Sequence, residues 1–589
     1  MLKKNIVYVI LLLSFTLAIA IRWNGVSGDN YRSIINSDGR GYYHYYEAML
    51  GKTLMLEQQA NGTFLVNTPD GKVVNKYFVG LPILWSPFVM PVYFYHRLLD
   101  NREVDLYSEG FQKAVSLAAL FYLLLGLIAL KKLFESFNLE PKVIGFSLFA
   151  FFFGTNLSYY TIIAPSMSHV YSFALIAAFL YFVRVFSTKE KPKYILYASI
   201  ILGFIILIRP LNGLILFAIP IVWKSDVLFI KLIRNNITTI AISSLLVLLV
   251  LFIQTFFWNL QTGSLLQWSY TGEGFYFNNP QILKFVFSFR KGFLIYTPII
   301  GFSIISLGLI FHRNKKRAIF SLGFILLLIY VLSSWWNWYY GDSYGSRVMI
   351  DYLPVFILLF ALGLQYANVK VRLWIVIISM LLITFNIFQS YQYYHNIMSH
   401  FDMNGEKYSF IFLKSGKNYE NKIGGNDDIA PYHREPMELV YDIYGTPCHG
   451  KGYSVVCRGE STITIDGEKI DCVIVDKDPY VCGFIIDADS LLKYRGLYTE
   501  LQNSTYSDEE LNDVFWTVSL SDKNGKFHYY AFRINGIPVK DGEWRTDIYR
   551  FPIPTPKDSN TKIQISIWNK GERSFIIKDI RIKLYGIVH

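Results

Sequence analysis

The chain has 589 residues and a net charge of +12, and 53% of its residues are hydrophobic. Its many apolar runs are long enough for helices that cross a bilayer, which takes roughly 17–25 residues, and this excludes an ordinary soluble domain. Many lysines and arginines fall in short loops between these runs, which indicates membrane orientation rather than a nucleic-acid-binding surface. We therefore expect a polytopic membrane protein that binds no nucleic acid.

The first apolar run, residues 5–21, follows Lys3 and Lys4, which place the N-terminus in the cytoplasm. Residues 22–110 then form an extracytoplasmic loop. Within this loop the apolar stretch 79–98 carries Pro82, Pro87 and Pro91. Because proline removes a helical hydrogen bond and kinks the chain, we expect a broken helix at the outer interface there, with a full span as the alternative.

Ten further spans follow, so the predicted total is about eleven. Each predicted inside loop between them contains lysine or arginine. An odd number of spans places the tail that begins near residue 391 outside the cytoplasm. The ten spans are expected at 111–130, 143–160, 170–185, 194–208, 211–223, 237–258, 293–311, 318–332, 348–366 and 373–389.

The tail, residues 391–589, differs in pattern from the rest of the chain. Segments 461–465, 563–567 and 576–584 largely alternate apolar and polar residues, which is typical of half-buried strands. Turn pairs such as Asp466-Gly467, Asn535-Gly536 and Lys570-Gly571 separate such segments. Short strands with frequent turns predict an extracytoplasmic β-sandwich or jelly roll.

All four cysteines lie in this tail: Cys448, Cys457, Cys472 and Cys482. Four cysteines allow three pairings, and the sequence does not choose among them. Disulfides form in oxidising compartments, which agrees with a tail outside the cytoplasm. A zinc site is the less favoured alternative, because no C-x-x-C pair is present.

One polar stretch in the first loop, residues 37–47 with the sequence SDGRGYYHYYE, stands out. Asp38 is our candidate general base, and Glu47 is a second, weaker acidic candidate. We interpret the neighbouring glycines as residues that let the backbone turn around Asp38. Four tyrosines form an aromatic face suited to the bilayer interface or to stacking on a sugar ring. The alternative is an interfacial aromatic belt with a solvated aspartate. The tyrosines are Tyr42, Tyr43, Tyr45 and Tyr46.

Other polar groups gather in the loops predicted to lie outside. Arg209 precedes Pro210 at a helix break, where a charge needs a partner or water; an arginine that snorkels to the interface is the alternative. Arg347 follows a Gly-rich turn and suits a phosphate, or else it pairs with Asp342 or Asp351. His169 is a sugar contact or a capping residue near a helix start. The loops also hold Lys76, Glu273 and Arg290.

Five stretches in this order resemble the GT-C membrane glycosyltransferases, which include protein O-mannosyltransferases and the bacterial lipid A aminoarabinose transferase. The resemblance covers roughly residues 1–390. That family carries an acidic residue in its first extracytoplasmic loop and a lysine ahead of an interfacial helix, and Asp38 and Lys76 occupy similar positions. The stretches are residues 37–42, 75–82, 167–173, 288–298 and 340–347.

The resemblance implies an inverting glycosyltransferase of the cell envelope, in the inner or plasma membrane, with residues 1–390 as its catalytic domain. The donor is a sugar on polyprenyl phosphate, and the acceptor is an extracytoplasmic hydroxyl of a glycolipid, polysaccharide or protein. Asp38 accepts the acceptor's proton. The donor phosphate is bound by Lys76, Arg347, Arg209 and Arg290. The sugar or lipid is contacted by Tyr42, Tyr43, His169 and Asp342.

No cofactor is expected. A divalent metal is the alternative, and its oxygen ligands would come from Asp38, Glu47, Glu273 and Asp342. Rival functions are a transporter or flippase for lipid-linked sugars, a polysaccharide polymerase or ligase, and a non-catalytic scaffold whose tail binds carbohydrate or protein. A transporter is disfavoured because the polar residues gather at one membrane face and no internal repeat is visible.

Overall fold

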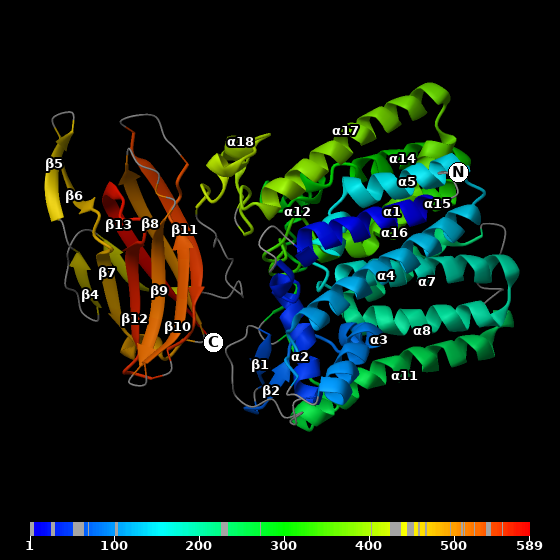
Figure 1. The fold of residues 1–589 in the computed structure, drawn as a ribbon, viewed down its shortest axis with the longest axis horizontal. Coiled ribbons are helices and arrows are strands. Elements are labelled where there is room, and N and C mark those ends of the chain that lie inside the picture. Colours follow the sequence, from blue (N-terminus) through cyan, green and yellow to red (C-terminus); the bar gives the residue numbers. More distant parts are fainter. Residues whose placement is uncertain are drawn as a thin grey trace. The chain divides into compact units, whose positions relative to one another are not determined.

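The computed structural model divides the chain into two compact units (Figure 1). The first consists of Met1–Phe287, Lys291–Tyr340 and Tyr344–Ser390, and the second of Ser288–Arg290, Gly341–Ser343 and Tyr391–His589. The structure describes residues 5–24, 30–50, 64–68, 70–100, 104–224, 234–270, 273–401, 403–424, 437–444, 453–457, 460–465, 468–494, 496–507, 511, 513–522, 525–537, 543–556 and 558–588.

The first unit is helical. Seven helices in the described part of the chain are long and apolar enough to cross a membrane, and four apolar helical segments are shorter. Each of the eleven predicted spans overlaps one of these segments. The long ones are α1 with η2 (Ile6–Asn24), α4 (Glu109–Glu135), α7 (His169–Lys189), α11 (Ile237–Thr262), α15 (Lys315–Ser333), α16 (Met349–Tyr366) and α17 (Val369–Tyr394). The short ones are α5 (Pro141–Gly154), α8 (Pro192–Ile208), η5 with α9 (Pro210–Val222) and α14 (Ile300–Arg313).

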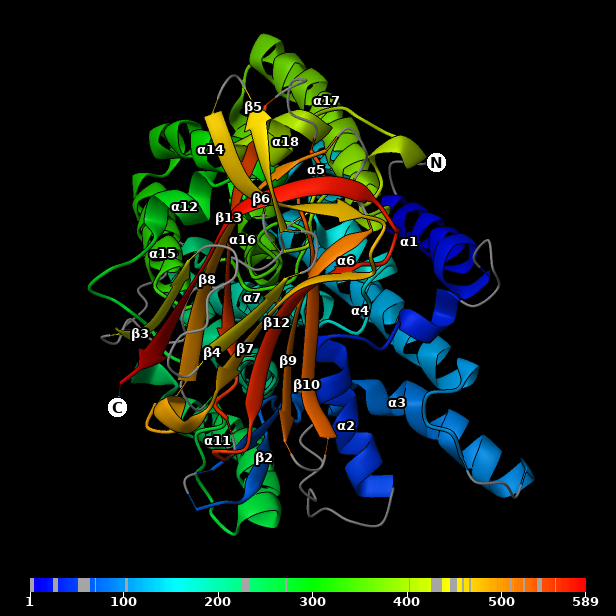
Figure 2. The ribbon, with the colours of Figure 1, turned by 90° about the vertical axis from the view of Figure 1, so that its left-hand side faces the viewer.

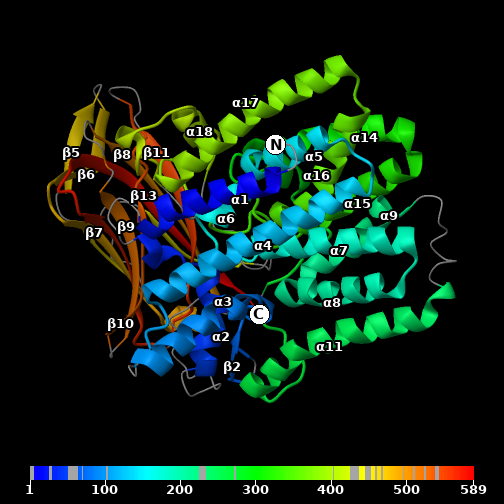
Figure 3. The ribbon, with the colours of Figure 1, turned by 45° about the vertical axis from the view of Figure 1, so that its right-hand side comes forward.

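Burial separates inner helices from outer ones. Helix α16 is almost entirely buried, whereas α11 and α17 expose most of their apolar side chains, as lipid-facing helices do. Helices α4, α7, α8 and α11 pack in that order and lie side by side in Figures 1 and 3. The packing brings the start of α7 and the start of α16 to the end of α8.

The prediction of a broken helix at residues 79–98 is wrong. Helix α3 (Gly80–Tyr95) runs through Pro87 and Pro91 and continues as the π-helical turn η4 (His96–Asp100). Each proline removes one backbone hydrogen bond, and packing against a neighbouring helix compensates for that loss. Here α3 packs against α4, and Trp85 is fully buried.

Two predicted spans are instead interrupted. The segment predicted at 143–160 ends its first helix at Gly154, and the short helix α6 (Leu157–Ile162) follows. The segment predicted at 293–311 divides at Pro298 into α13 (Phe293–Tyr296) and α14. An interruption by proline follows from its missing N–H group.

The first loop contains the elements that carry several candidate residues. These are η3 (Asn30–Ser33), α2 (Asp38–Leu50) and the antiparallel hairpin β1 (Leu65–Asn67) and β2 (Val73–Asn75). The sequence interpretation missed this hairpin, because its strands have three residues each and show no usable alternation. Helix α12 (Ile282–Phe287) lies in a later loop.

The second unit confirms the predicted β-sandwich. One sheet has the strand order β10-β9-β12-β7-β4, and the other has β11-β8-β13-β6-β5 with β3 also pairing with β13. Figure 2 shows β7, β12, β9 and β10 side by side. The strands are β3 (Met437–Tyr444), β4 (Tyr453–Cys457), β5 (Glu460–Ile465), β6 (Glu468–Asp476), β7 (Tyr480–Asp487), β8 (Gly496–Tyr506), β9 (Val514–Asp522), β10 (Gly525–Arg533), β11 (Arg545–Ile553), β12 (Lys562–Asn569) and β13 (Ser574–Ile587). The short helical elements are α18 (Gly405–Ile411), η6 (Lys417–Tyr419) and η7 (Asp489–Leu491).

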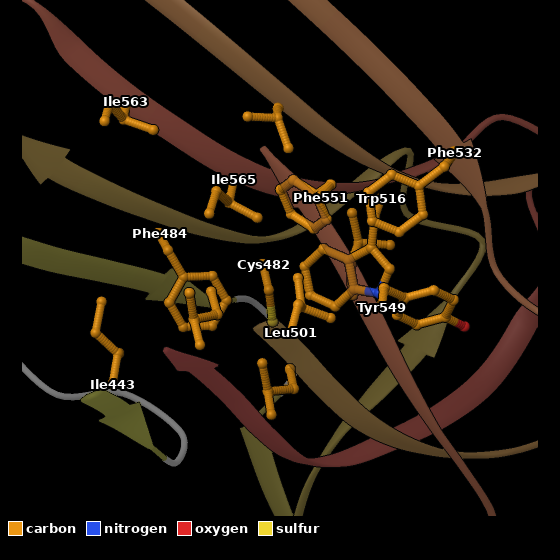
Figure 4. Close-up of a cluster of buried hydrophobic side chains, with 14 of the residues drawn as sticks. Ile443, Cys482, Phe484, Leu501, Trp516, Phe532, Tyr549, Phe551, Ile563 and Ile565 are labelled. Atoms are coloured by element: carbon orange, nitrogen blue, oxygen red, sulfur yellow. The ribbon is translucent and has the colours of Figure 1, made fainter. Parts of the chain in front are cut away.

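One hydrophobic core joins the two sheets (Figure 4). Trp516, Ile563 and Ile565 enter it from the first sheet, and Leu501 and Phe551 enter it from the second. Alternate residues of each strand face this core, so the remaining residues lie on the outer faces. Because this alternation is shared by strands that pair residue by residue, the outer-face residues form rows that run across the strands.

The structure confirms the predicted disulfide bonding for one cysteine. Cys482 is disulfide-bonded, and it is buried in the core. Cys472 is also buried, whereas Cys448 and the predicted turn Asp466-Gly467 lie outside the described residues. A disulfide argues against the zinc alternative at Cys482 and supports a tail outside the cytoplasm. The orientation of the chain stays a prediction.

Candidate active site

Asp38 is the first residue of α2, and Arg347 precedes α16. An Arg347 guanidinium nitrogen, Nη1, lies 2.9 Å from Asp38 Oδ2. Ser37 adopts a positive φ of 48° and so makes the turn that starts the helix. The same Arg347 nitrogen lies 3.5 Å from the sulfur of Met167. Arg347 therefore pairs with Asp38, a partner that the sequence alternatives did not include.

Gly39 and Gly41 have a different role from the one predicted. Both lie inside α2, and neither has a positive φ. A Cβ atom at Gly39 would lie 2.2 Å from Ser166 Oγ, and one at Gly41 would lie 2.3 Å from the ring of Tyr77. The two glycines allow these neighbours to approach the helix that carries Asp38. The expectation that they turn the backbone is wrong.

Gly41→Ala should therefore displace Tyr77 and lower any activity that depends on Asp38. Forcing an added methyl group into a packed site costs about 1–3 kcal/mol of stability. Gly308→Ala in α14 is the matched control, because nothing lies within 4 Å of a Cβ there. Thermal unfolding and turnover of both variants test this expectation, and equal behaviour of the two would contradict it.

Lys76 and Tyr77 follow strand β2, and α2 fixes them in place. Asn75 Nδ2 donates to the Gly41 carbonyl at 2.8 Å, and Tyr45 donates from its hydroxyl to the Tyr77 carbonyl at 2.8 Å. The side chain of Tyr77 in turn hydrogen-bonds to Asp38.

The Lys76 ammonium has two partners from the loop after α11. It forms an ion pair with Glu273, and it lies 5.2 Å from the ring centroid of Tyr270. Ser269 donates from its hydroxyl to the Lys76 carbonyl at 2.9 Å. The lysine next to Asp38 is thus held in a defined position with its charge matched.

A second buried ionic group lies beside the first. Asp351 in the first turn of α16 accepts a hydrogen bond from His169, with 2.8 Å between Oδ1 and Nδ1. Arg209 Nη1 lies 3.7 Å from Asp351 Oδ2. It also lies 3.2 and 3.4 Å from the two ring nitrogens of His169, so it approaches the ring between them. The side chains of His169 and Asp351 are 2% and 1% exposed. Arg209 is therefore paired at depth, which argues against snorkelling.

The surrounding charges keep Asp38 ionised. Burial acts to raise its pKa, but Arg347, the hydrogen bond from Tyr77, Lys76 and Arg209 outweigh burial, and its pKa lies below the ordinary value. Burial raises the pKa of Tyr42 to about 12, so its hydroxyl stays protonated. Tyr42 lies near the charges of Asp38 and Arg209, and its ring centroid is 4.6 Å from that of Tyr77.

The aromatic face predicted for the four tyrosines is wrong. All four rings are at least 96% buried, and the face they form packs inside the protein. Tyr43 is fully buried and donates to the Leu106 carbonyl at 2.7 Å, so it packs the core and offers no stacking surface for a sugar. Helical spacing places tyrosines on several sides of α2, which the first-loop elements cover.

Arg290 and Asp342 belong to the second unit, and each makes a hydrogen bond within it. Arg290 Nε donates to the Phe401 carbonyl at 3.3 Å, and Tyr393 donates to Asp342 at 2.8 Å. The structure thus brings together Asp38, Lys76, Arg209, Arg347, Tyr42 and His169 of the nine predicted site residues.

Sequence reasoning missed the importance of Tyr77 and Asp351. Asp351 appeared only as an alternative partner for Arg347. The sequence did contain a signal for Asp351, because a carboxylate inside an apolar span is costly and so marks a functional or paired group. Tyr77 carried no comparable signal, because tyrosine is common near membrane surfaces.

The four candidate metal ligands do not converge. Asp38 faces Arg347, Glu273 faces Lys76, and Glu47 lies 2.6 Å from His44. Among the described residues, no group of three or more histidine, cysteine or acidic side chains has metal-binding geometry.

No protein-family model matches the chain, and no curated protein matches it in sequence. Solved structures that are similar to it include two archaeal structures and one mycobacterial structure. The apo oligosaccharyltransferase of Archaeoglobus fulgidus aligns over 74% of this chain and 62% of its own, with TM-score 0.41 and 12% identity. The oligosaccharyltransferase AglB of the same organism, in complex with an inhibitory peptide and a dolichol-phosphate, aligns over 75% and 62%, with TM-score 0.37 and 12% identity.

The arabinosyltransferase EmbB of Mycobacterium smegmatis aligns over 99% of this chain and 67% of its own, with TM-score 0.32 and 10% identity. The chain spans less than two thirds of the length of the two archaeal structures. At these identities the likeness concerns fold alone.

Proposed function

We propose that the chain is an inverting glycosyltransferase that moves a sugar from a polyprenyl-phosphate donor to an acceptor hydroxyl outside the cytoplasm. The observation that carries the proposal is the ion pair between Asp38 and Arg347, with Tyr77 bonded to the same carboxylate. One group can accept a proton, and the other can bind a phosphate. They come from distant parts of the sequence and meet at one place.

In the proposed reaction, Asp38 accepts the proton of the acceptor hydroxyl as its oxygen attacks the anomeric carbon of the donor. The bond from that carbon to the phosphate oxygen breaks, and the lipid phosphate leaves with the electron pair. One displacement from the face opposite the leaving group inverts the anomeric configuration. The acceptor must therefore approach from the side of Asp38.

The leaving phosphate needs cations, and each cation near Asp38 already has a carboxylate partner. Arg347 pairs with Asp38, Lys76 with Glu273, and Arg209 with Asp351. We infer that the donor phosphate replaces Asp38 as the partner of Arg347. This exchange releases the carboxylate for proton transfer when donor is bound.

The three ionic residues of the second group, His169, Arg209 and Asp351, all lie at helix ends rather than at helix centres. A transporter of lipid-linked sugars needs ionisable groups near the middle of the membrane. The arrangement therefore supports a transferase with a site at one membrane face.

The direct test uses purified protein in liposomes with a radiolabelled polyprenyl-phosphate sugar and an extract of envelope glycans. We expect labelled sugar to move to an acceptor with inversion, as read from the anomeric configuration of the product. Release of label without an acceptor would indicate a hydrolase. Movement of intact donor between leaflets with no sugar transfer would contradict the proposal and favour a flippase.

The rate should keep its neutral-pH value well into the acid range. The pKa of Asp38 lies below 3.8, so its carboxylate becomes protonated only as pH falls through that lower pKa. Its ion pair with Arg347 is lost over the same pH range. In Arg347→Gln, burial is opposed by fewer charges, so the acid limb of the rate should move to higher pH. A pH profile of kcat/KM for both proteins tests this, and an unmoved limb would count against Asp38 as the titrating group.

A further inference from the structure

The outer face of the five-stranded sheet contains a row of small side chains. Strand pairing places Ala531 opposite Thr517, Thr517 opposite Ser566, and Ser566 opposite Gly483. These residues alternate with core residues such as Trp516, Ile565 and Phe484, so they lie on the outer side of β10, β9, β12 and β7. Neighbouring strands are about 4.8 Å apart, so the row is a floor about 14 Å long across the sheet.

Larger side chains flank this floor on one side. The next row holds Arg533, Phe515, Trp568 and Tyr480, paired across the same four strands. The ring centroids of Phe515 and Trp568 are 5.6 Å apart, and Tyr480 is 62% exposed. The row forms an aromatic wall.

A β-bulge puts Tyr480 into that wall. The pairing of β12 with β7 shifts between Ser566 and Trp568, and the consecutive residues Val481 and Cys482 both point into the core. The extra residue reverses the alternation, which turns Tyr480 to the outer face beside Trp568. Bulges commonly re-aim a side chain in this way.

The row on the other side of the floor is polar and aromatic. It consists of Tyr529, Ser519, Gln564 and Ile485. Tyr529 is 51% exposed, and Gln564 is exposed with a side-chain amide able to donate and accept. Each flanking row lies two residues along the strands from the floor, or about 7 Å. We call the floor with its two flanking rows the outer trough.

We propose that the outer trough binds a glycan chain. Sugars present C–H groups that pack on aromatic rings and hydroxyls that hydrogen-bond to amides and hydroxyls. The trough supplies rings in Trp568, Tyr480 and Tyr529, and a side-chain amide in Gln564. Its small floor leaves depth for one chain of linked rings. A peptide strand would instead seek an unpaired sheet edge, which this face does not offer.

The glycine in the floor gives a sharp test. A Cβ atom at Gly483 would have its nearest neighbours at 3.9 Å, so a side chain there fits the fold and fills the trough. The experiment immobilises glycans of different composition and applies labelled full-length protein in a detergent without a sugar headgroup. Such a detergent avoids competition from alkyl glycosides. We expect the protein to bind one class of glycan, and Gly483→Leu and Trp568→Ala to weaken that binding about tenfold or more.

The matched control is Tyr444→Ala, which removes a 60% exposed tyrosine from β3 of the other sheet. It should bind as the unchanged protein does. Gln564→Ala is a further variant at an exposed position, and it should weaken binding without affecting the fold. Absence of binding to every glycan, full binding by Gly483→Leu, or an equal loss in Tyr444→Ala would each overturn the proposal. The measurement needs no lipid-linked donor, so its outcome is independent of the transferase activity.

Discussion

Asp38→Asn should fold and insert normally and lose sugar transfer by about 10²–10⁴-fold, the usual contribution of a well-placed general base. Asparagine has nearly the same shape as aspartate, but its amide does not accept a proton at neutral pH. The hydrogen bond with Tyr77 can persist, whereas the ion pair with Arg347 is lost. Because the variant removes the carboxylate charge that lies 2.9 Å from Arg347 and competes with the donor phosphate, donor binding should be preserved or tightened.

The measurement is a comparison of kcat and donor KM for the unchanged protein and the variant. Glu47→Gln is the matched control, since Glu47 lies on the same helix, pairs with His44 and has no contact with Arg347. It should retain its turnover. Turnover of Asp38→Asn near that of the unchanged protein would rule out Asp38 as the base.

Arg347→Ala should lower transfer by about 10²–10³-fold, the typical effect of removing a preorganised donor to a developing charge. The side chain is 12% exposed, and its fork of N–H groups matches the geometry of a phosphate. The loss should appear mainly with the donor, as a raised donor KM and a lower kcat, while the acceptor KM changes little. Arg347→Lys keeps the charge but not the fork, so it should recover part of the rate.

Arg372→Ala serves as the control for removing an arginine ion pair. Arg372 pairs with Glu140 at 3.1 Å, and this pair is far more exposed to solvent. Its loss should change the rate little, as is usual for surface pairs. If Arg347→Ala affected the acceptor KM alone, the phosphate role of Arg347 would be wrong.

Seven of the eleven predicted spans fall on helices of the described chain that are long and apolar enough to cross a membrane, because a bilayer requires such helices, and the other four fall on shorter apolar helices. The α16 and α11 segments were found although one is buried and the other exposed, since both are apolar on all sides. Proline positions predicted the helix interruptions less well. The segment at 293–311 is interrupted at Pro298, but α3 continues through Pro87 and Pro91. The sequence does not reveal where packing against a neighbouring helix compensates for the hydrogen bond that a proline removes.

The site was predictable only in part. Local sequence pattern singled out Asp38 and Arg209, motif resemblance supported Asp38, Lys76 and Arg347, and the structure places the charges of all four near one another. The pairing was not predictable, because which acid meets which base depends on contacts between distant elements. The alternative to phosphate binding paired Arg347 with Asp342 or Asp351, and the structure pairs it with Asp38. The burial of Tyr43 was not predicted for the same reason, because the sequence of a helix does not reveal which of its sides other elements cover.

The matching of each cation by a resident carboxylate bears on how the protein discriminates among lipids. A bilayer is rich in anionic headgroups, and a site with bare positive charge would fill with them. Here a phospholipid that enters must separate an existing ion pair and gains little in return. A headgroup that carries a sugar gains further contacts, and these can compensate for the cost of separating the ion pair. With the proposed lipid-phosphate donor, we expect the balanced ion pairs to select against the most abundant anions in the membrane.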